Sequence, residues 1–146
     1  KWSNSTTVNT TTLLKLPENQ ISSNHLNIEI TGIKNKQGQI CLSLFNKHHG
    51  FPNDGNNAIQ TSCIKVTDIK ERVTLTNLAP GSYAIAIFHD ENNDGILNFN
   101  WVGIPTEGFG FSQNPPILKG IPKFKDSAII VSDSEINIEI KLKYLL

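Results

Sequence analysis

Methionine is absent from all 146 residues, even from position 1. We therefore expect that the first residue is not a translation start and that a leader has been removed. The opening residues are polar and contain no apolar signal-peptide core. No apolar run approaches the roughly 20 residues that a membrane-spanning helix needs, so we expect no membrane span.

An excess of positive charge is also missing. The 13 Lys and Arg residues equal the 13 Asp and Glu residues in number, and no basic run occurs. Nucleic-acid binders usually carry a basic face, so we expect no nucleic-acid partner.

Cysteine is scarce as well. Cys41 and Cys63 do not have a C-x-x-C spacing, which excludes a zinc site built on cysteines.

The two cysteines lie in segments that are predicted to be neighbouring strands. If these strands pair as an antiparallel hairpin, the register that places Phe45 opposite Ile59 also places Cys41 opposite Cys63. This arrangement allows a disulfide, which would stabilise the fold by roughly 3 kcal/mol. Two free, buried thiols are the alternative.

A helical period of useful length is missing, and a period of two takes its place from residue 26 onward. In the first strand, for example, Leu26, Ile28 and Ile30 alternate with polar residues, as a half-buried strand requires. The predicted strands are 26–31, 39–45, 58–66, 72–78, 82–89, 128–132 and 135–144. The strand at 82–89 is apolar on both faces, so we expect it to be central and covered on both sides.

These seven short strands, separated by turn signals, predict an all-β fold. We expect an antiparallel β-sandwich of immunoglobulin-like or transthyretin-like build. The length fits one domain, which we place at residues 25–146. Residues 1–24 are rich in Ser, Thr and Asn, and this composition predicts a flexible polar N-terminal segment.

A calcium loop is predicted directly after the central strand. Its D-x-N-x-D-G pattern consists of Asp90, Asn92, Asp94 and Gly95. Gly95 permits a tight bend that turns the oxygens inward, and hard calcium prefers such oxygen ligands. Further ligands of the predicted site are the carbonyl of Ile96 and the side chain of Asn98.

The loop departs from an EF-hand, because its twelfth position is Trp101 where a bidentate glutamate would be needed. We expect Glu107, in a Pro-x-Glu-Gly turn, to supply the missing carboxylate. Asn93-Asp94-Gly95 also has the chemistry of a type I′ hairpin turn, which is the alternative without metal.

His89 precedes Asp90 and raises a second possibility, a transition-metal or catalytic pair with His48 and His49 nearby. Adjacent residues on a strand point to opposite faces, so His89 and Asp90 are not expected to bind one ion. No nucleophile and base accompany them in the sequence. We therefore interpret His89 as a strand-end residue and the pair His48-His49 as solvated.

Four aromatic residues follow the loop within a short glycine-containing segment: Phe99, Trp101, Phe109 and Phe111. If they are exposed, they can stack on a sugar or hold a peptide. If they are buried, they close the end of the sandwich. We favour burial, because aromatic side chains contribute strongly to core packing.

Two motifs carry a resemblance to a known family. They are Gly-Ser-Tyr-Ala-Ile-Ala-Ile-Phe-His-Asp-Glu-Asn-Asn-Asp-Gly from Gly81, and Gly-Ile-Pro-Thr-Glu-Gly-Phe-Gly-Phe-Ser from Gly103. With the later Pro122-x-Phe124-x-Asp126-x-Ala128, the chain resembles a family of uncharacterised bacterial proteins, a domain of unknown function, over residues 26–144. The resemblance implies an exported β-sandwich and no activity. The loop alone is also similar to calcium loops in B-type repeats of bacterial surface adhesins.

Three functions are consistent with these residues. The first is an exported, non-enzymatic module at the cell surface or in the periplasm, stabilised by calcium, with a binding, adhesion or structural role toward a protein or carbohydrate. The second is a carbohydrate- or peptide-binding domain that uses Trp101 and Phe109. The third is a metal-dependent hydrolase that uses His89, Asp90 and Glu107. Exposure of Trp101 would favour the second, and a histidine beside the metal would favour the third.

Overall fold

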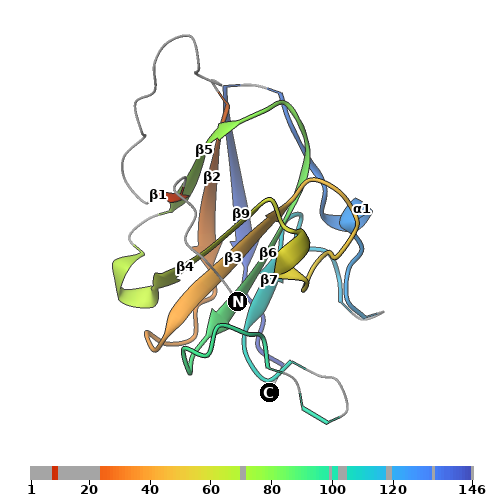
Figure 1. Ribbon diagram of the computed structural model, residues 1–146. Helices are drawn as coiled ribbons and strands as arrows, with labels where there is room; N and C mark the ends of the chain where they lie inside the picture. The colour runs from red at the N-terminus through yellow and green to blue at the C-terminus, as the bar shows by residue number, and fades with distance from the viewer. Residues whose placement is uncertain are drawn as a thin grey trace.

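The computed structural model describes residues 8–9, 24–69, 72–98, 100–101, 105–117, 120–132 and 134–145. Figure 1 shows two β-sheets that pack against each other. The first has the strand order β1-β5-β2-β9, and the second has the order β4-β3-β6-β7, with β8 paired to β6. The strands are β1 (Val8–Asn9), β2 (Asn24–Thr31), β3 (Gln39–Phe45), β4 (Gln60–Lys65), β5 (Val73–Leu78), β6 (Gly81–Asp90), β7 (Phe109–Phe111), β8 (Ile129–Val131) and β9 (Glu135–Lys141). The predicted β-sandwich is confirmed.

All seven predicted strands are present, and two short strands add to them. β1 lies in the N-terminal segment, and β7 lies in the aromatic segment, which had no strand prediction. In the described residues the helical elements are one turn each: η2 (Gly55–Asn57), η3 (Val66–Asp68) and α1 (Phe124–Ser127). No helix in the described part of the chain is long and apolar enough to cross a membrane.

One strand pair differs from the predicted antiparallel arrangement. β2 and β9 run parallel, with Leu26 opposite Ile136 and Ile140 opposite Ile30. The period-two pattern of each strand could not reveal this, because apolar residues alternate in the same way in both kinds of pair. The other strand pairs are antiparallel.

The predicted polar N-terminal segment, residues 1–24, lies mostly outside the described residues. Its described members are Val8–Asn9, which pair with β5, and Asn24, the first residue of β2. Asn24 is buried, and its side-chain amide donates a hydrogen bond to the Leu78 carbonyl at 3.0 Å.

The main core lies between the two sheets. It contains Leu26, Ile28, Val73, Leu75 and Ile140 from the first sheet, and Ile40, Leu42, Leu44, Ile85 and Ile87 from the second. Burying one such side chain contributes roughly 1.5–3 kcal/mol. β6 is central, with β3 on one side and β7 and β8 on the other, and it is buried from Tyr83 to Asp90. The prediction that this strand is covered on both faces is confirmed.

A second, smaller core covers the outer face of the five-stranded sheet. It consists of Cys41, Phe45, Ala86, Phe88, Phe109 and Phe111. Phe51, from the loop between β3 and β4, packs edge-on against Phe45 and Phe124, with ring centroids 5.2 and 6.1 Å away. In Figure 1 this yellow loop and α1 lie on the same side of β6.

The disulfide that the sequence left open is present. Cys41 and Cys63 lie opposite each other in the β3–β4 hairpin, and their sulfur atoms are 2.05 Å apart. The register that joins them also pairs Leu44 with Gln60, as the predicted hairpin requires. The alternative of two free thiols is therefore wrong.

Candidate metal centre

Asp90, the last residue of β6, organises the loop that follows it. Its side chain is 0 % exposed. One carboxylate oxygen accepts hydrogen bonds from the Gln39 side chain at 2.8 Å and from the Gly95 N–H at 2.7 Å. The other accepts the Asp94 N–H at 3.1 Å. The loop backbone is thus wrapped around one buried carboxylate.

The conformation of the loop follows from residues that tolerate positive φ. Asn93 has φ of 59° and Gly95 has φ of 79°. A type I′ turn at Asp94-Gly95 would need positive φ at both residues, and Asp94 does not have it. In addition, β6 ends at Asp90 and its next antiparallel neighbour in sequence, β7, begins at Phe109. The hairpin-turn alternative is therefore wrong.

Glu107 reaches the same loop from the segment that leads into β7. Its carboxylate accepts the Glu91 N–H at 3.1 Å and the Asn98 N–H at 3.2 Å, so it bridges the two ends of the loop. The preceding residue, Thr106, donates its N–H to the Asn98 carbonyl at 2.9 Å. Glu107 is 7 % exposed. The loop and the approach to β7 therefore form one connected structure.

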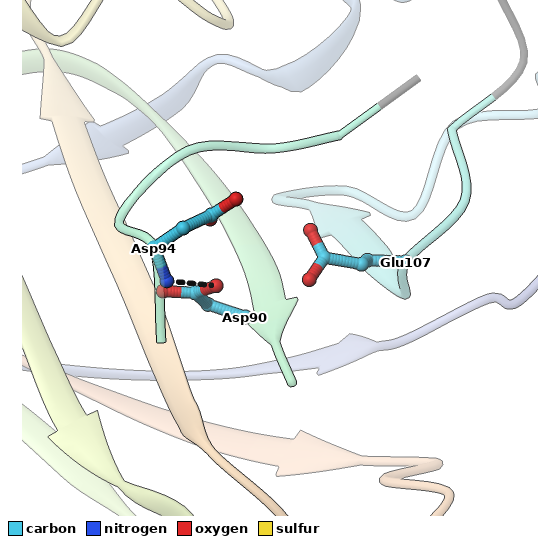
Figure 2. A group of neighbouring side chains, drawn as sticks. All are labelled: Asp90, Asp94 and Glu107. Atoms are coloured by element: carbon cyan, nitrogen blue, oxygen red, sulfur yellow. Dashed lines mark hydrogen bonds between the residues drawn. The ribbon is translucent and has the colours of Figure 1, made fainter. Parts of the chain in front are cut away.

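The three carboxylates converge on one space. Figure 2 shows the side chain of Glu107 pointing toward Asp90 and Asp94. One oxygen from each residue lies within 4.8 Å of the others. Two oxygens bound to the same calcium ion lie at most about 4.6–5.2 Å apart, which is twice the metal–oxygen distance. The spacing therefore fits a calcium ion.

Electrostatics also favour a cation here. Burial raises the pKa of the Glu107 carboxyl, and the negative charges of Asp90 and Asp94 raise it further against the lowering effect of the Asn98 N–H. For Asp94, desolvation acts to raise the pKa, but hydrogen bonds, led by that from the Ile96 N–H, lower it overall. Among the described residues, no lysine or arginine forms a salt bridge with these three carboxylates.

The remaining predicted ligands lie around this cluster. The Asn92 amide donates to Asp94 at 3.2 Å and to the Asn98 side-chain oxygen at 3.4 Å. Ile96 lies in the same loop with an exposed side chain, and its N–H donates to Asp94. Sequence reasoning missed Gln39, which the β3–β6 register places opposite Asp90. The strand prediction alone did not give that register.

His89 is not available to this cluster. It is fully buried, and both of its ring nitrogens have hydrogen-bond partners. Nε2 lies 2.6 Å from the Gln37 carbonyl oxygen, and Nδ1 lies 2.7 Å from the Tyr144 hydroxyl. A carbonyl only accepts, so Nε2 is assigned as the donor, and in a neutral imidazole Nδ1 then accepts from the Tyr144 hydroxyl. His48 and His49 are exposed in the loop after β3.

The aromatic residues after the loop divide into two groups. Phe109 and Phe111 are buried in the outer core, as predicted. Trp101 is 95 % exposed, which contradicts the prediction of burial for this residue. Phe99 lies outside the described residues. Because Phe109 is buried, it does not form an exposed surface with Trp101.

Comparison with known proteins supplies a family for this fold and site. Residues 28–139 match the family described as "Uncharacterized protein conserved in bacteria (DUF2141)". The chain belongs to this family. The predicted resemblance to an uncharacterised bacterial family is confirmed. The matched residues include the whole loop and Glu107. No curated protein and no solved structure matches the chain.

Proposed function

We propose that this chain is an exported, non-enzymatic β-sandwich module that is stabilised by calcium. The ligands are Asp90, Asn92, Asp94, Ile96, Asn98 and Glu107. The role is binding, adhesion or structural support at the bacterial cell surface or in the periplasm. The convergence of three carboxylates without a basic partner carries the proposal.

Calcium provides a physical reason for this arrangement. Three like charges within a few ångströms repel one another, and a divalent cation would turn that repulsion into attraction. A flexible cage of carboxylate, amide and carbonyl oxygens is the type of site that calcium takes. Asn92 now donates to the oxygens around it, and a bound ion would replace it in that role.

The disulfide supports export. Disulfides persist in oxidising compartments such as the periplasm and the extracellular space. Cys41–Cys63 is buried at Cys41 and lies within the sheet, so it has a structural position.

The hydrogen bonds of both ring nitrogens of His89 count against the metal-dependent hydrolase. Neither nitrogen is left to bind a metal or to move a substrate proton.

Calorimetric calcium titration tests the proposal directly. The wild type should bind one calcium ion, and magnesium should bind more weakly because it demands a smaller, near-octahedral site. Asp94→Asn and Glu107→Gln should each weaken calcium binding by roughly tenfold or more, as loss of a charged ligand does. Glu29→Gln, at an exposed residue of β2, is the matched control and should bind like the wild type. Equal affinity in all four proteins would refute the site.

Carbohydrate binding is a second candidate, and the exposure of Trp101 favours it. An exposed tryptophan face can stack on a sugar ring. If this candidate holds, soluble oligosaccharides should quench the intrinsic fluorescence of the wild type, and Trp101→Ala should lose the binding. Unchanged binding in Trp101→Ala would exclude a role for this side chain.

A further inference from the structure

A hollow lies on the outer face of the five-stranded sheet, beside the smaller core. Its volume is about 530 Å³. Small-molecule sites are typically clefts of about 300–1,000 Å³ lined mainly by apolar side chains. The hollow therefore has the size of a ligand site.

The floor of the hollow is formed by small residues of adjacent strands. Ser43 of β3 lies opposite Ala86 of β6, and Ala86 lies opposite Phe111 of β7. Phe88 and Phe109, the next outward-facing pair along these strands, also line the hollow. Two small side chains beside large aromatic ones leave a depression in the sheet surface.

The walls come from loops on opposite sides of this floor. They are provided by residues 52–56, by Ile117 with residues 120–122, and by Ile96-Leu97 of the metal loop. Phe51 anchors loop 46–57 to the five-stranded sheet, because its ring packs against Phe45 and Phe111 with centroids 5.2 and 6.2 Å away. The wall on that side is therefore fixed by packing.

Ser43 gives the hollow a polar group without a partner. Ser43 is 1 % exposed, and its hydroxyl has no hydrogen-bond partner among the described residues. Buried polar groups in native proteins are nearly always hydrogen-bonded, and an unsatisfied group calls for an explanation. A ligand that fills the hollow and offers one hydrogen-bonding group would satisfy it.

The charges of the residues that line the hollow restrict the chemical class of the ligand. Its described residues include no lysine, arginine or histidine, and Asp54 is the one charged residue among them. The Asp54 carboxylate already accepts the Asn56 N–H at 3.0 Å and the Asn57 amide at 2.6 Å. Among these described residues an anionic ligand would thus lose its hydration without gaining a cation partner. A neutral ligand fits best.

We propose that this hollow, the Ser43 site, binds a neutral, largely apolar small molecule with one hydrogen-bonding group that pairs with the Ser43 hydroxyl. The proposal goes beyond the calcium-stabilised module. Ile96 is shared, because its carbonyl is a proposed calcium ligand and the residue also lines the hollow. Ser43, Ala86 and the three phenylalanines are not proposed calcium ligands, so at a fixed calcium concentration substitutions at these residues test the hollow alone.

Three probes that share a naphthalene ring test the predicted ligand class: 2-naphthol, naphthalene and 2-naphthoate. Each is titrated by fluorescence at neutral pH and one calcium concentration. We expect 2-naphthol to bind more tightly than naphthalene, and 2-naphthoate to bind most weakly. Ser43→Ala should weaken 2-naphthol binding by roughly three- to tenfold, the effect of one hydrogen bond. The same change should leave naphthalene binding nearly unaltered.

Two further variants test the location. Ala86→Leu should fill the floor and abolish binding of 2-naphthol. Ser82→Leu places the same side chain on β6, on the same face but outside the hollow, and should bind like the wild type. If Ala86→Leu fails to fold, Ile121→Asp at the half-exposed rim should weaken binding instead. No 2-naphthol binding, tightest binding of 2-naphthoate, or binding that survives both Ala86→Leu and Ile121→Asp would overturn the proposal.

Discussion

At the residue scale, Asp90 and Asp94 belong to the same predicted ligand set but differ in environment. Asp90 is fully buried and accepts three hydrogen bonds, from Gln39, Asp94 and Gly95. Asp94 is exposed. The two carboxylates therefore have different structural roles before any ion binds.

This difference predicts unequal effects of alanine substitution. Asp90→Ala removes the acceptor of three partly buried donors and leaves a cavity at a fully buried position, so it should lower the free energy of unfolding by about 1–3 kcal/mol. Asp94→Ala should leave the stability of the metal-free fold nearly unchanged and remove the calcium response. Urea unfolding in chelator measures the first effect, and repetition in calcium measures the second. Equal stability of the two variants in chelator would contradict this account of Asp90.

The pair of His89 and Tyr144 allows a second prediction at this scale. Tyr144 donates to His89 Nδ1 and accepts the Lys34 N–H at 3.0 Å. Tyr144→Phe keeps the ring but leaves the buried nitrogen unpaired, so it should lower the free energy of unfolding by about 1–3 kcal/mol. Denaturant unfolding checks this value. The double variant with His89→Leu should recover part of the loss, because the unpaired nitrogen is then gone.

Sequence reasoning worked well for residues whose role depends on local pattern. The D-x-N-x-D-G spacing located Asp90 and Asp94, which the structure places together with Glu107. The prediction of burial was wrong for Trp101, since aromatic character alone does not decide between a buried and an exposed position. Sequence reasoning also missed Gln39 and the partners of His89, because these contacts join segments about 50 residues apart in sequence.

At the scale of elements, alternation in the sequence was sufficient to locate seven strands. It did not predict β7, which has three residues with glycine at the centre. Gly110 is required there by close packing, since a Cβ at this position would lie 2.8 Å from a methyl carbon of Ile140. The parallel β2–β9 pair was missed for a related reason. It depends on the path of the whole chain and not on the pattern within either strand.

The β3–β4 hairpin provides a prediction for the disulfide. Cys41 and Cys63 are 22 residues apart, and closing a loop of this length stabilises the native state by about 3 kcal/mol through the unfolded chain. A reducing agent should therefore lower the free energy of unfolding by roughly this amount. The double variant Cys41→Ala/Cys63→Ala should be less stable and unresponsive to the reducing agent. A wild type that does not respond to complete reduction would contradict the estimate.

The link between the metal loop and β7 provides a second prediction at the scale of elements. Glu107 accepts N–H groups of Glu91 and Asn98, and β7 follows two residues later. Glu107→Gln removes one negative charge and one acceptor oxygen from this bridge. We expect faster amide hydrogen exchange at residues 106–111 than in the wild type, with β2 and β5 unaffected. Exchange that increases equally in β2 would instead indicate global destabilisation.

At the scale of the whole molecule, the core between the two sheets, the smaller core on the outer face of the five-stranded sheet and a disulfide stabilise the fold. The acidic cluster lies at one end of the central strand β6. Ion binding there adds stability through mass action. A ligand that binds only the native state stabilises it by about 2.7 kcal/mol at a concentration 100 times its dissociation constant. The fold should therefore exist without calcium but melt at a lower temperature.

Chelator should lower the melting temperature of the wild type, and calcium should restore it more fully than equimolar magnesium, because three oxygens within 4.8 Å suit the larger ion. Glu107→Gln should show a smaller calcium shift, whereas the control Glu29→Gln should show the wild-type shift. Differential scanning calorimetry measures all of these values. If the melting temperature of the wild type is the same in chelator and calcium, the carboxylates do not form a calcium site, and the hydrogen bonds from the loop N–H groups and the Gln39 amide are what offsets their mutual repulsion.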